Sequence, residues 1–387
     1  MPLDRCYALL TPATKFSFGW HEVWRVNQKI KKRVLIVDDA VVVRKALSLA
    51  IALDPDLEVC ATAVNGRVGL AKFMASKPDI VLLDVEMPEM DGLETVRELR
   101  RIDALVPIIM FSSLTERGAA TTLDALALGA TDYVTKPSNI DGAATLEAVT
   151  GELIPKIRVL CRLPAERLAI PCSPVAPPPR LPVVRQAGLL PPAQVVAIGV
   201  STGGPDALAR VLPALPAQFR VPIVIAQHMP PIFTSMLAAR LSAKAALPVR
   251  ECVSGEVLSE GCAVIAPGDY HMVVREENGV PCLQTHQGPK ENFCRPSVDV
   301  LFRSVAGLYG DRALAVVLTG MGQDGLKGCE ALRKAGARIY VQDEASSVVW
   351  GMPGFVARAG LADKILPLHQ IGAAIVRATT MQSAAHA

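Results

Sequence analysis

A serine, a histidine and an aspartate in the second half of the chain each follow closely on a run of apolar, mostly β-branched residues. Ser201 comes after the run 195–200, His228 after the run 223–226, and Asp324 after the run 313–318. Because parallel strands bring their carboxyl ends to one edge of a sheet, we expect the three side chains to meet there. A serine hydroxyl needs a neighbouring base to become a nucleophile, and a histidine held by a carboxylate supplies one. The three residues therefore predict a Ser-His-Asp triad.

The turn after Ser201 has the features of a nucleophile-bearing strand–turn–helix junction. Residues 199–203 match the pattern G-x-S-x-G, and Pro205 occupies the position of a first helical residue. Backbone N–H groups of this turn could form an oxyanion hole. A tight turn with a capping serine would show the same five residues, so the motif alone leaves both interpretations open. The order Ser…His…Asp also differs from that of the α/β-hydrolases, whose topology is therefore not assumed.

A second group of reactive side chains lies in the first half of the chain, also at the ends of apolar runs. Asp38, Asp39 and Asp84 end two such runs, Ser112 ends a third and Lys136 a fourth. Carboxylates that converge at one rim repel each other unless a divalent cation lies among them, and an all-oxygen site suits Mg²⁺. A carboxylate beside Mg²⁺ and an ammonium group could attack phosphorus, with Ser112 donating to the resulting acyl phosphate.

The elements that must position these residues alternate between strands and helices. In the first half, five strand-then-helix units within about 120 residues predict a parallel doubly wound sheet. The expected strands are 34–37, 59–63, 80–85, 108–111 and 133–134. A second alternating pattern starts at 195 and predicts another parallel sheet. The segments 263–266 and 272–274 flank Pro267-Gly268-Asp269, which suggests a β-hairpin insertion.

Composition divides the chain into four parts and excludes several classes of protein. We expect an unassigned extension over 1–31, a first α/β domain over 32–155, a proline-rich linker over 156–193 and a second α/β domain over 194–382. The net charge of +3 predicts no nucleic-acid partner. No apolar run is long enough for a membrane helix, and no export signal is evident. Nine scattered cysteines fit a reducing compartment. We therefore expect a cytoplasmic monomer without membrane insertion.

The first domain closely resembles the receiver domain of two-component response regulators. The resemblance rests on the segments 37–39, 83–88, 91–92 and 133–137 together with Ser112. It implies that Asp84 accepts a phosphoryl group from a histidine kinase and that Asp38 and Asp39, with Asp84, bind Mg²⁺. It also implies that Ser112 and Lys136 form the switch pair.

The second domain resembles the chemotaxis protein-glutamate methylesterase (CheB) family. The resemblance rests on the segments 199–204, 227–230, 266–268, 295–299, 318–325 and 351–353, and with the receiver it covers roughly 33–380. It implies that Ser201, His228 and Asp324 hydrolyse glutamyl methyl esters on chemoreceptors, with glutamine deamidation as a second activity. Thr202 and Met321 match positions that line the family's active site. The extension at the amino terminus and the dense prolines of the linker depart from the family pattern.

We expect the unphosphorylated receiver to pack over the rim that carries Ser201 and to restrict access until Asp84 is phosphorylated. Three alternatives remain. The output domain could bind a partner without catalysis, which loss of ester hydrolysis in purified protein would support. A DNA-binding regulator would need a basic recognition helix, which the sequence does not supply. A nucleotide site at Gly203-Gly204 would need the spacing of a phosphate-binding loop, which is missing.

Overall fold

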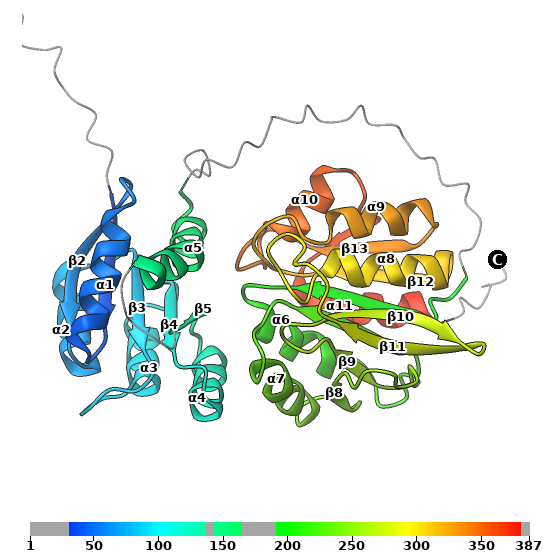
Figure 1. Cartoon of the computed structure of the whole chain (residues 1–387), viewed down its shortest axis with the longest axis horizontal. Helices are drawn as coiled ribbons and strands as arrows, with labels where there is room; N and C mark the ends of the chain where they lie inside the picture. The colour runs from blue at the N-terminus through cyan, green and yellow to red at the C-terminus, as the bar shows by residue number, and fades with distance from the viewer. Residues whose placement is uncertain (1–30, 137–142, 164–190, 381–387) are drawn as a thin grey trace, which may run out of the picture.

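The structure is a computed structural model that describes residues 31–136, 143–163 and 191–380. These residues form two α/β domains, each built on one twisted sheet with helices on both faces (Figure 1). The expected extension apart from its last residue, Lys31, and the linker apart from its two ends lie outside the described residues.

The first domain is built on a five-stranded parallel sheet in the order β2-β1-β3-β4-β5. Its strands are β1 (Lys32–Val37), β2 (Leu57–Ala63), β3 (Ile80–Asp84), β4 (Ile108–Ser112) and β5 (Asp132–Thr135). Its helices are α1 (Val41–Ala52), α2 (Gly66–Ser76), α3 (Gly92–Ile102), α4 (Glu116–Ala127) and α5 (Ala143–Leu160). The middle strands are buried on both faces, which explains why they read as unbroken apolar runs rather than alternating ones.

The expected end of this domain at residue 155 falls inside α5, which continues to Leu160. The pattern of the sequence fades after Gly151, so we placed the domain boundary before the end of this helix. The helix continues because its last turns are packed and paired: Ile157 is buried, and Arg158 forms ion pairs of 2.6 Å and 3.1 Å with two carboxylates that precede β2. Tertiary contacts thus override the weak local pattern.

The second domain is built on a seven-stranded sheet in the order β14-β13-β12-β6-β7-β9-β8, with every strand parallel to its neighbours. Its strands are β6 (Val195–Val200), β7 (Ile223–Gln227), β8 (Val249–Glu251), β9 (Ala263–Ile265), β12 (Ala313–Val317), β13 (Arg338–Gln342) and β14 (Lys364–Leu366). Helices α6 (Gly204–Val211), α7 (Phe233–Ser242) and α11 (Leu368–Thr379) pack on one face. Helices α8 (Val298–Tyr309), α9 (Leu326–Lys334) and α10 (Met352–Arg358) pack on the other.

The expected hairpin exists, but it is not formed by the segments that we assigned to it. The segment 263–265 is β9, a strand of the parallel sheet, whereas β10 (His271–Glu277) pairs antiparallel with β11 (Val280–His286). The turn between them is Asn278-Gly279, with φ of 52° and 80°. Asn-Gly is the favoured two-residue hairpin turn, so the sequence contained the correct signal at a later position than the one we chose.

Strand β6 lies at the point where the order of the second sheet reverses. The chain passes from β6 to β7 on one side and returns to β12 on the other. At such a point the loops at the carboxyl ends of the two strands diverge and leave a crevice between them. Ser201 immediately follows β6 and therefore lies in this position.

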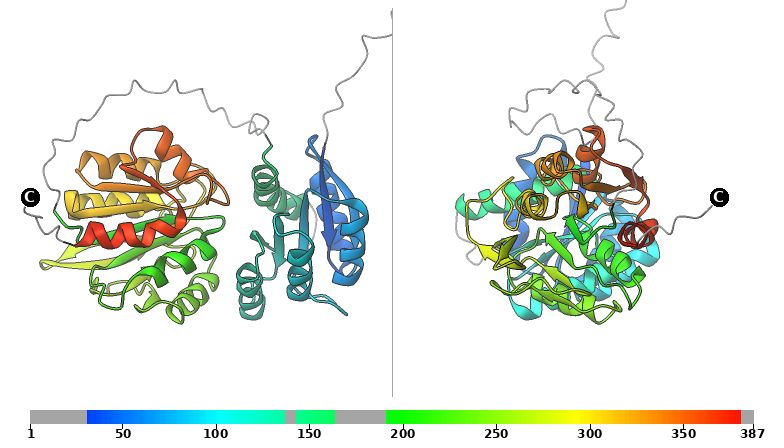
Figure 2. Two further views of the ribbon diagram at one scale, coloured as in Figure 1. Left: turned by 180° about the vertical axis from the view of Figure 1, so that it is seen from behind. Right: turned by 90° about the vertical axis from the view of Figure 1, so that its right-hand side faces the viewer.

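The two domains meet through α4 and β5 of the first domain and α6 and α7 of the second, as the opposite views of Figures 1 and 2 show. Tyr133 of β5 stacks on Phe233 of α7, with ring centroids 4.9 Å apart and the planes tilted by 6°. Arg240 of α7 pairs with Asp124 of α4 at 2.6 Å. One buried apolar cluster runs from the first sheet across this interface into the second.

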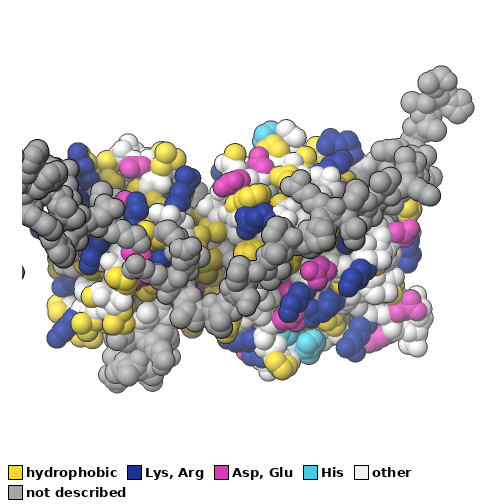
Figure 3. All heavy atoms as spheres, turned by 90° about the horizontal axis from the view of Figure 1, so that it is seen from above, with side chains coloured by type: hydrophobic (Ala, Val, Ile, Leu, Met, Phe, Trp, Pro, Cys, Tyr) yellow, Lys and Arg dark blue, Asp and Glu magenta, His cyan; other side chains and the backbone are white. Residues whose placement is uncertain are grey.

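The described part of the chain carries charged side chains of both signs on its surface, and free cysteines. Basic and acidic side chains are interspersed over the face shown in Figure 3. Within the described residues, the cysteines are free thiols and no helix is both long and apolar enough to cross a membrane.

Candidate active site

Ser201, His228 and Asp324 come together at the carboxyl ends of three adjacent parallel strands. Ser201 follows β6, His228 follows β7, and Asp324 lies in the loop after β12. Strands β6 and β7 are in register at Val200 and Gln227, so Ser201 and His228 form the next pair along the two strands. The backbone N–H of His228 also donates to the carbonyl of Val200 at 3.1 Å. The three residues therefore lie at one rim of the sheet, and within the described residues the side-chain contact among them is the one between His228 and Asp324.

The turn that carries Ser201 is held by its backbone and by close packing. Gly203 has φ of 76°, a conformation that glycine adopts without steric cost, and the N–H of Gly204 donates to the Ser201 carbonyl at 2.8 Å. The Ser201 N–H donates to Thr319 at 3.0 Å. A Cβ at Gly199 would lie 2.3 Å from the side chain of Val298, so α8 can approach β6 only because residue 199 is glycine.

His228 is held by Asp324 through one ring nitrogen and faces a cysteine through the other. Its Nε2 lies 2.7 Å from Asp324 Oδ2, and its Nδ1 lies 3.5 Å from the sulfur of Cys294. Burial lowers the pKa of His228, but the Cys294 sulfur and the Asp324 carboxylate outweigh burial and raise that pKa to about 10. The protonated ring is thus strongly favoured, and the neutral fraction needed for a general base grows as the pH rises.

Asp324 is the most fully hydrogen-bonded carboxylate of this rim. Besides His228, it accepts hydrogen bonds from the hydroxyl of Ser297 at 2.9 Å and from the backbone N–H groups of Val298 and Asp299 at 2.7 Å and 3.1 Å. The last two begin α8, so the carboxylate lies on the positive end of a helix dipole. Burial raises the pKa of Asp324, but His228 and these donors lower it well below its usual range.

Three residues of this rim were not singled out from the sequence as functional. Ser297 is the N-cap of α8, yet its hydroxyl bonds to Asp324 rather than to its own helix. Asn292 donates to Asp324 and to Asp299, each at 2.9 Å. A serine before the helical pattern at 298 was a readable capping signal. Cys294 and Asn292 had no such signal, because their contacts with the triad are non-local.

The two residues expected to line the site differ in their contacts. Met321 follows Gly320, which packs against the nucleophile turn: a Cβ at Gly320 would lie 2.8 Å from the Cβ of Ser201. Thr202 is buried, and its hydroxyl donates to Asp132 of the first domain at 3.0 Å. Its side chain therefore faces the domain interface, while its backbone N–H remains available at the turn for an oxyanion.

The expected phosphorylation site is assembled at the carboxyl rim of the first sheet. Carboxylate oxygens of Asp38, Asp39 and Asp84 all lie within 4.8 Å of one another. Lys136 pairs with Asp84 at 2.7 Å and with Asp38 at 3.2 Å. Ser112 is fully buried, and its hydroxyl donates to the backbone carbonyl of Gly118 in α4 at 3.2 Å. The hydroxyl of Ser112 is thus attached to the helix that contacts the second domain.

The donors of this rim fit Mg²⁺. All three are carboxylates, the hard ligands that Mg²⁺ prefers, and the buried Oδ2 of Asp38 has the Lys136 ammonium at 3.2 Å but no further hydrogen-bond donor within the described residues. Burial raises the pKa of Asp84 to about 6; Lys136 and the Val85 N–H lower it in part, and Asp38 raises it further. A divalent cation here would favour the ionised form of Asp84, which the protein by itself leaves only partly stabilised.

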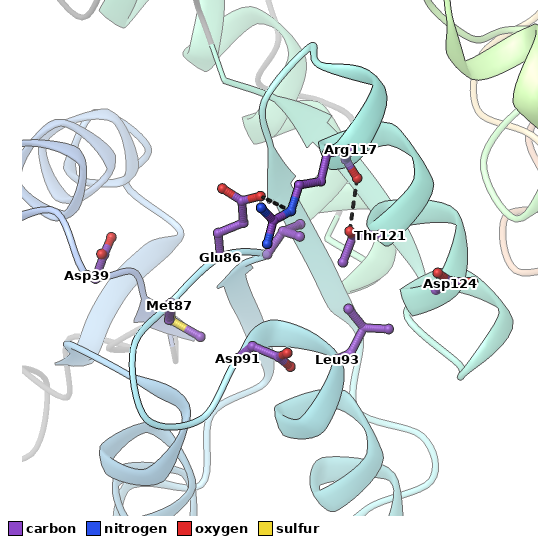
Figure 4. Close-up of a pocket in the computed structure, with 9 residues that line it drawn as sticks. Asp39, Glu86, Met87, Asp91, Leu93, Arg117, Thr121 and Asp124 are labelled. Carbon is purple, nitrogen blue, oxygen red and sulfur yellow. Dashed lines mark hydrogen bonds and ion pairs between the residues drawn. The ribbon is translucent and has the colours of Figure 1, made fainter.

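A hollow of about 570 Å³ opens beside Asp84, and Figure 4 shows the side chains that line it. Asp39 lies at one end and Asp124 at the other. Arg117 of α4 and Glu86 form an ion pair of 3.4 Å over it. Because Asp124 also pairs with Arg240 of the second domain, the hollow extends from the acidic rim to the domain interface.

Fold and site define a two-domain regulator in which an acidic receiver-type domain is packed against an α/β domain with a Ser-His-Asp grouping. The family model "CheB methylesterase" matches residues 196–375, and the model "Response regulator receiver domain" matches residues 34–146. The chain belongs to the CheB family of chemotaxis methylesterases that carry a receiver domain.

Curated relatives match over nearly the whole length. A protein-glutamate methylesterase/protein-glutamine glutaminase of Trichodesmium erythraeum is 50% identical over 90% of this chain and 99% of its own. One from Caulobacter vibrioides is 47% identical over 88% of this chain and 96% of its own. Among solved structures, the Thermotoga maritima CheB catalytic domain is 40% identical, with a TM-score of 0.47 over 48% of this chain and 98% of that chain.

Proposed function

We propose that Ser201, His228 and Asp324 hydrolyse glutamyl methyl esters on the cytoplasmic helices of chemoreceptors. The observation that carries this proposal is the 2.7 Å contact between His228 Nε2 and the Asp324 carboxylate, at the same rim as Ser201. The names of the relatives and the family membership supply the substrate class, and the site supplies a nucleophile, a base and an orienting carboxylate.

The reaction uses His228 through Nδ1, because Nε2 is engaged by Asp324. Nδ1 exchanges its contact with the Cys294 sulfur for the Ser201 hydroxyl and accepts the proton as Oγ attacks the ester carbonyl. The backbone N–H of Thr202 stabilises the oxyanion, since those of Ser201 and Gly204 already donate to backbone carbonyls. His228 then returns the proton to the leaving oxygen, and methanol departs. Water, deprotonated in turn by His228, releases glutamate and regenerates Ser201. With a glutamine side chain the same acyl-enzyme forms and ammonia leaves, so deamidation needs no further group.

The receiver inhibits this site until it is phosphorylated. In support, α4 and β5 pack on α6 and α7, the helices that follow Ser201 and His228, and the hydroxyl of Thr202, next to Ser201, is bonded to Asp132. A histidine kinase phosphorylates Asp84. Asp38 and Asp39, with Asp84, would hold Mg²⁺, which would offset the charge of the phosphoryl group. The new charge draws the hydroxyl of Ser112 from Gly118 towards the phosphoryl group. Helix α4 shifts with it, and its contacts with α6 and α7 weaken.

The test is methanol release from methylated receptor membranes by the full-length protein, with and without acetyl phosphate and Mg²⁺. Release that rises with the phosphodonor and is lost in Ser201→Ala supports both parts of the proposal. Asp84→Asn should keep its basal release and lose the stimulation. If folded wild-type protein released no methanol under any condition, the proposal would fail in favour of an output domain that only binds a partner.

A further inference from the structure

A tight two-residue turn at the active-site rim presents an aromatic ring to solvent. Residues 291–294 form the turn, closed by reciprocal backbone hydrogen bonds of 2.9 Å and 3.2 Å between Glu291 and Cys294. Its two central residues, Asn292 and Phe293, have φ of 51° and 63°. Two consecutive left-handed residues are typical of a type I′ turn, in which asparagine and glycine are common and phenylalanine is not.

Phe293 is unfavourable here in two respects. Its backbone adopts a left-handed conformation that costs an L-residue energy, and its side chain is 89% exposed. A single exposed apolar residue on a protein surface is ordinary. What distinguishes Phe293 is that strain and exposure coincide at one residue of the catalytic rim.

The turn is anchored to the triad on both sides of Phe293. Asn292 donates to Asp324 at 2.9 Å, and the Cys294 sulfur lies 3.5 Å from Nδ1 of His228. Glu291 pairs with Arg303 of α8 at 2.7 Å, which fixes the base of the turn to the helix that holds Asp324. Phe293 therefore lies between two residues that contact Asp324 and His228, the catalytic partners of Ser201.

Among the described residues, the receiver contacts α6, α7 and Thr202 of the second domain. Phe293 precedes α8, whose helix packs on the other face of the sheet, and is exposed with the receiver docked. Of the surfaces beside the site, the turn is thus one that remains open to a macromolecular substrate.

We propose that Phe293 is a substrate-binding residue that packs against the apolar side chains flanking the scissile glutamyl ester on an amphipathic receptor helix. This inference rests on the proposed function. For the ester to reach Ser201, its helix must cross the rim beside His228, where the turn stands. Side chains three and four positions from the ester lie on the same face of the receptor helix, within reach of the Phe293 ring at the rim of the active site. A ring that is already fixed in position binds with little loss of side-chain entropy.

The experiment compares two substrates in the full-length, phosphodonor-activated protein: methylated receptor membranes and N-acetylglutamate γ-methyl ester, which lacks a helix. Phe293→Gly removes the ring and suits the left-handed backbone, so this variant is not expected to impair folding. We expect KM for the receptor to rise about tenfold with kcat nearly unchanged, and hydrolysis of the small ester to stay within twofold. Phe293→Trp should retain the KM of the wild type.

The matched control is Val253→Gly, which removes another exposed apolar side chain of the same domain, away from the triad, and should leave both substrates unaffected. An unchanged receptor KM in Phe293→Gly, beside an active wild type, would overturn the inference alone. An equal loss on both substrates would mean that the turn only supports the triad, which also overturns it. Failure of the wild type on both substrates would instead refute the proposed function, and the inference with it.

Discussion

The protein contains two parallel sheets, each with a buried aspartate at its carboxyl rim, and the pKa values of these two carboxylates are shifted in opposite directions. Asp324 accepts hydrogen bonds from a histidine, a serine hydroxyl and the first backbone N–H groups of α8, and its pKa is lowered. Asp84 has mainly Lys136 and one backbone N–H as partners, and burial raises its pKa to about 6.

The difference fits the role that we propose for each carboxylate. In that proposal Asp324 orients and stabilises a charged imidazole, so a permanently ionised group held by many donors is suitable. Asp84 attacks phosphorus, and a carboxylate whose lone pairs are all engaged would be a poor nucleophile. Leaving it under-stabilised keeps it reactive and makes it dependent on a cation. The same architecture thus supports an orienting group in one sheet and a reacting group in the other.

The largest effect is expected from a substitution that removes the charge of Asp324. Asp324→Asn keeps the size of the side chain, but it disfavours the imidazolium and the productive tautomer of His228, so kcat should fall about 10³–10⁴-fold. Methanol release under saturating substrate measures this. Asp206→Asn, an exposed carboxylate of α6, is the control and should change little. A loss below tenfold would contradict the role assigned to Asp324.

The second prediction concerns the stability of the receiver. Because the pKa of folded Asp84 lies above its unfolded value, the folded protein binds more protons between the two values, and ionised Asp84 opposes folding above about pH 6. Asp84→Asn should therefore stabilise the receiver at pH 7 by up to about 3 kcal/mol, a gain that disappears as the pH falls towards 4. Hydrogen exchange of peptides from β1 and β3, at pH 7 and pH 4.5, measures it.

Asp324→Asn should instead lower the stability of the second domain at pH 7. Hydrogen exchange of peptides from β6 and β12 measures this change. The depressed pKa of Asp324 means that its ionised form favours folding above the unfolded pKa, with the contribution lost as the pH falls through the folded value. If both substitutions changed stability in one direction at pH 7, the contrast between the two rims would be wrong.

The third prediction concerns the pH dependence of catalysis. Only neutral His228 can accept the serine proton, so kcat/KM should rise with pH up to a pKa well above 6.5. Cys294→Ser weakens one of the two interactions that raise this pKa, and should move the rising limb to lower pH by up to about one unit. A pH–rate profile on a small ester measures the shift. Cys282→Ser, in the hairpin, is the control; an unshifted profile in Cys294→Ser would remove Cys294 from the electrostatics of the site.

The smallest effect is expected from a substitution that breaks an ion pair between the two domains. Arg240→Glu replaces the 2.6 Å pair with Asp124 by a like-charge contact, and should raise the unphosphorylated esterase rate about two- to fivefold. The pair is partly exposed, so a larger effect is not expected. Arg210→Glu, whose partner Asp206 belongs to the same domain, is the matched control. No increase in Arg240→Glu would mean that this ion pair does not restrain the receiver.

Much of the fold was predictable because its signals are local. Apolar runs bounded by glycine and proline marked most strands of both sheets. The errors came where a local signal competed with packing. The pattern fades after Gly151 in a helix that Arg158 and Ile157 extend, and Pro267-Gly268 was preferred as a hairpin turn over Asn278-Gly279. The short strands β8 and β14 were missed, since three residues carry too little pattern to distinguish strand from loop.

The sequence by itself determined which side chains lie at the two rims. A residue that follows a buried parallel strand must lie at its carboxyl end, and Ser201, His228 and Asp84 satisfy that condition by position alone. Only the tertiary structure decided how each group is tuned. Desolvation, the donors around Asp324, the sulfur beside His228 and the exposure of Phe293 all depend on segments far apart in the chain, whose proximity no local pattern encodes.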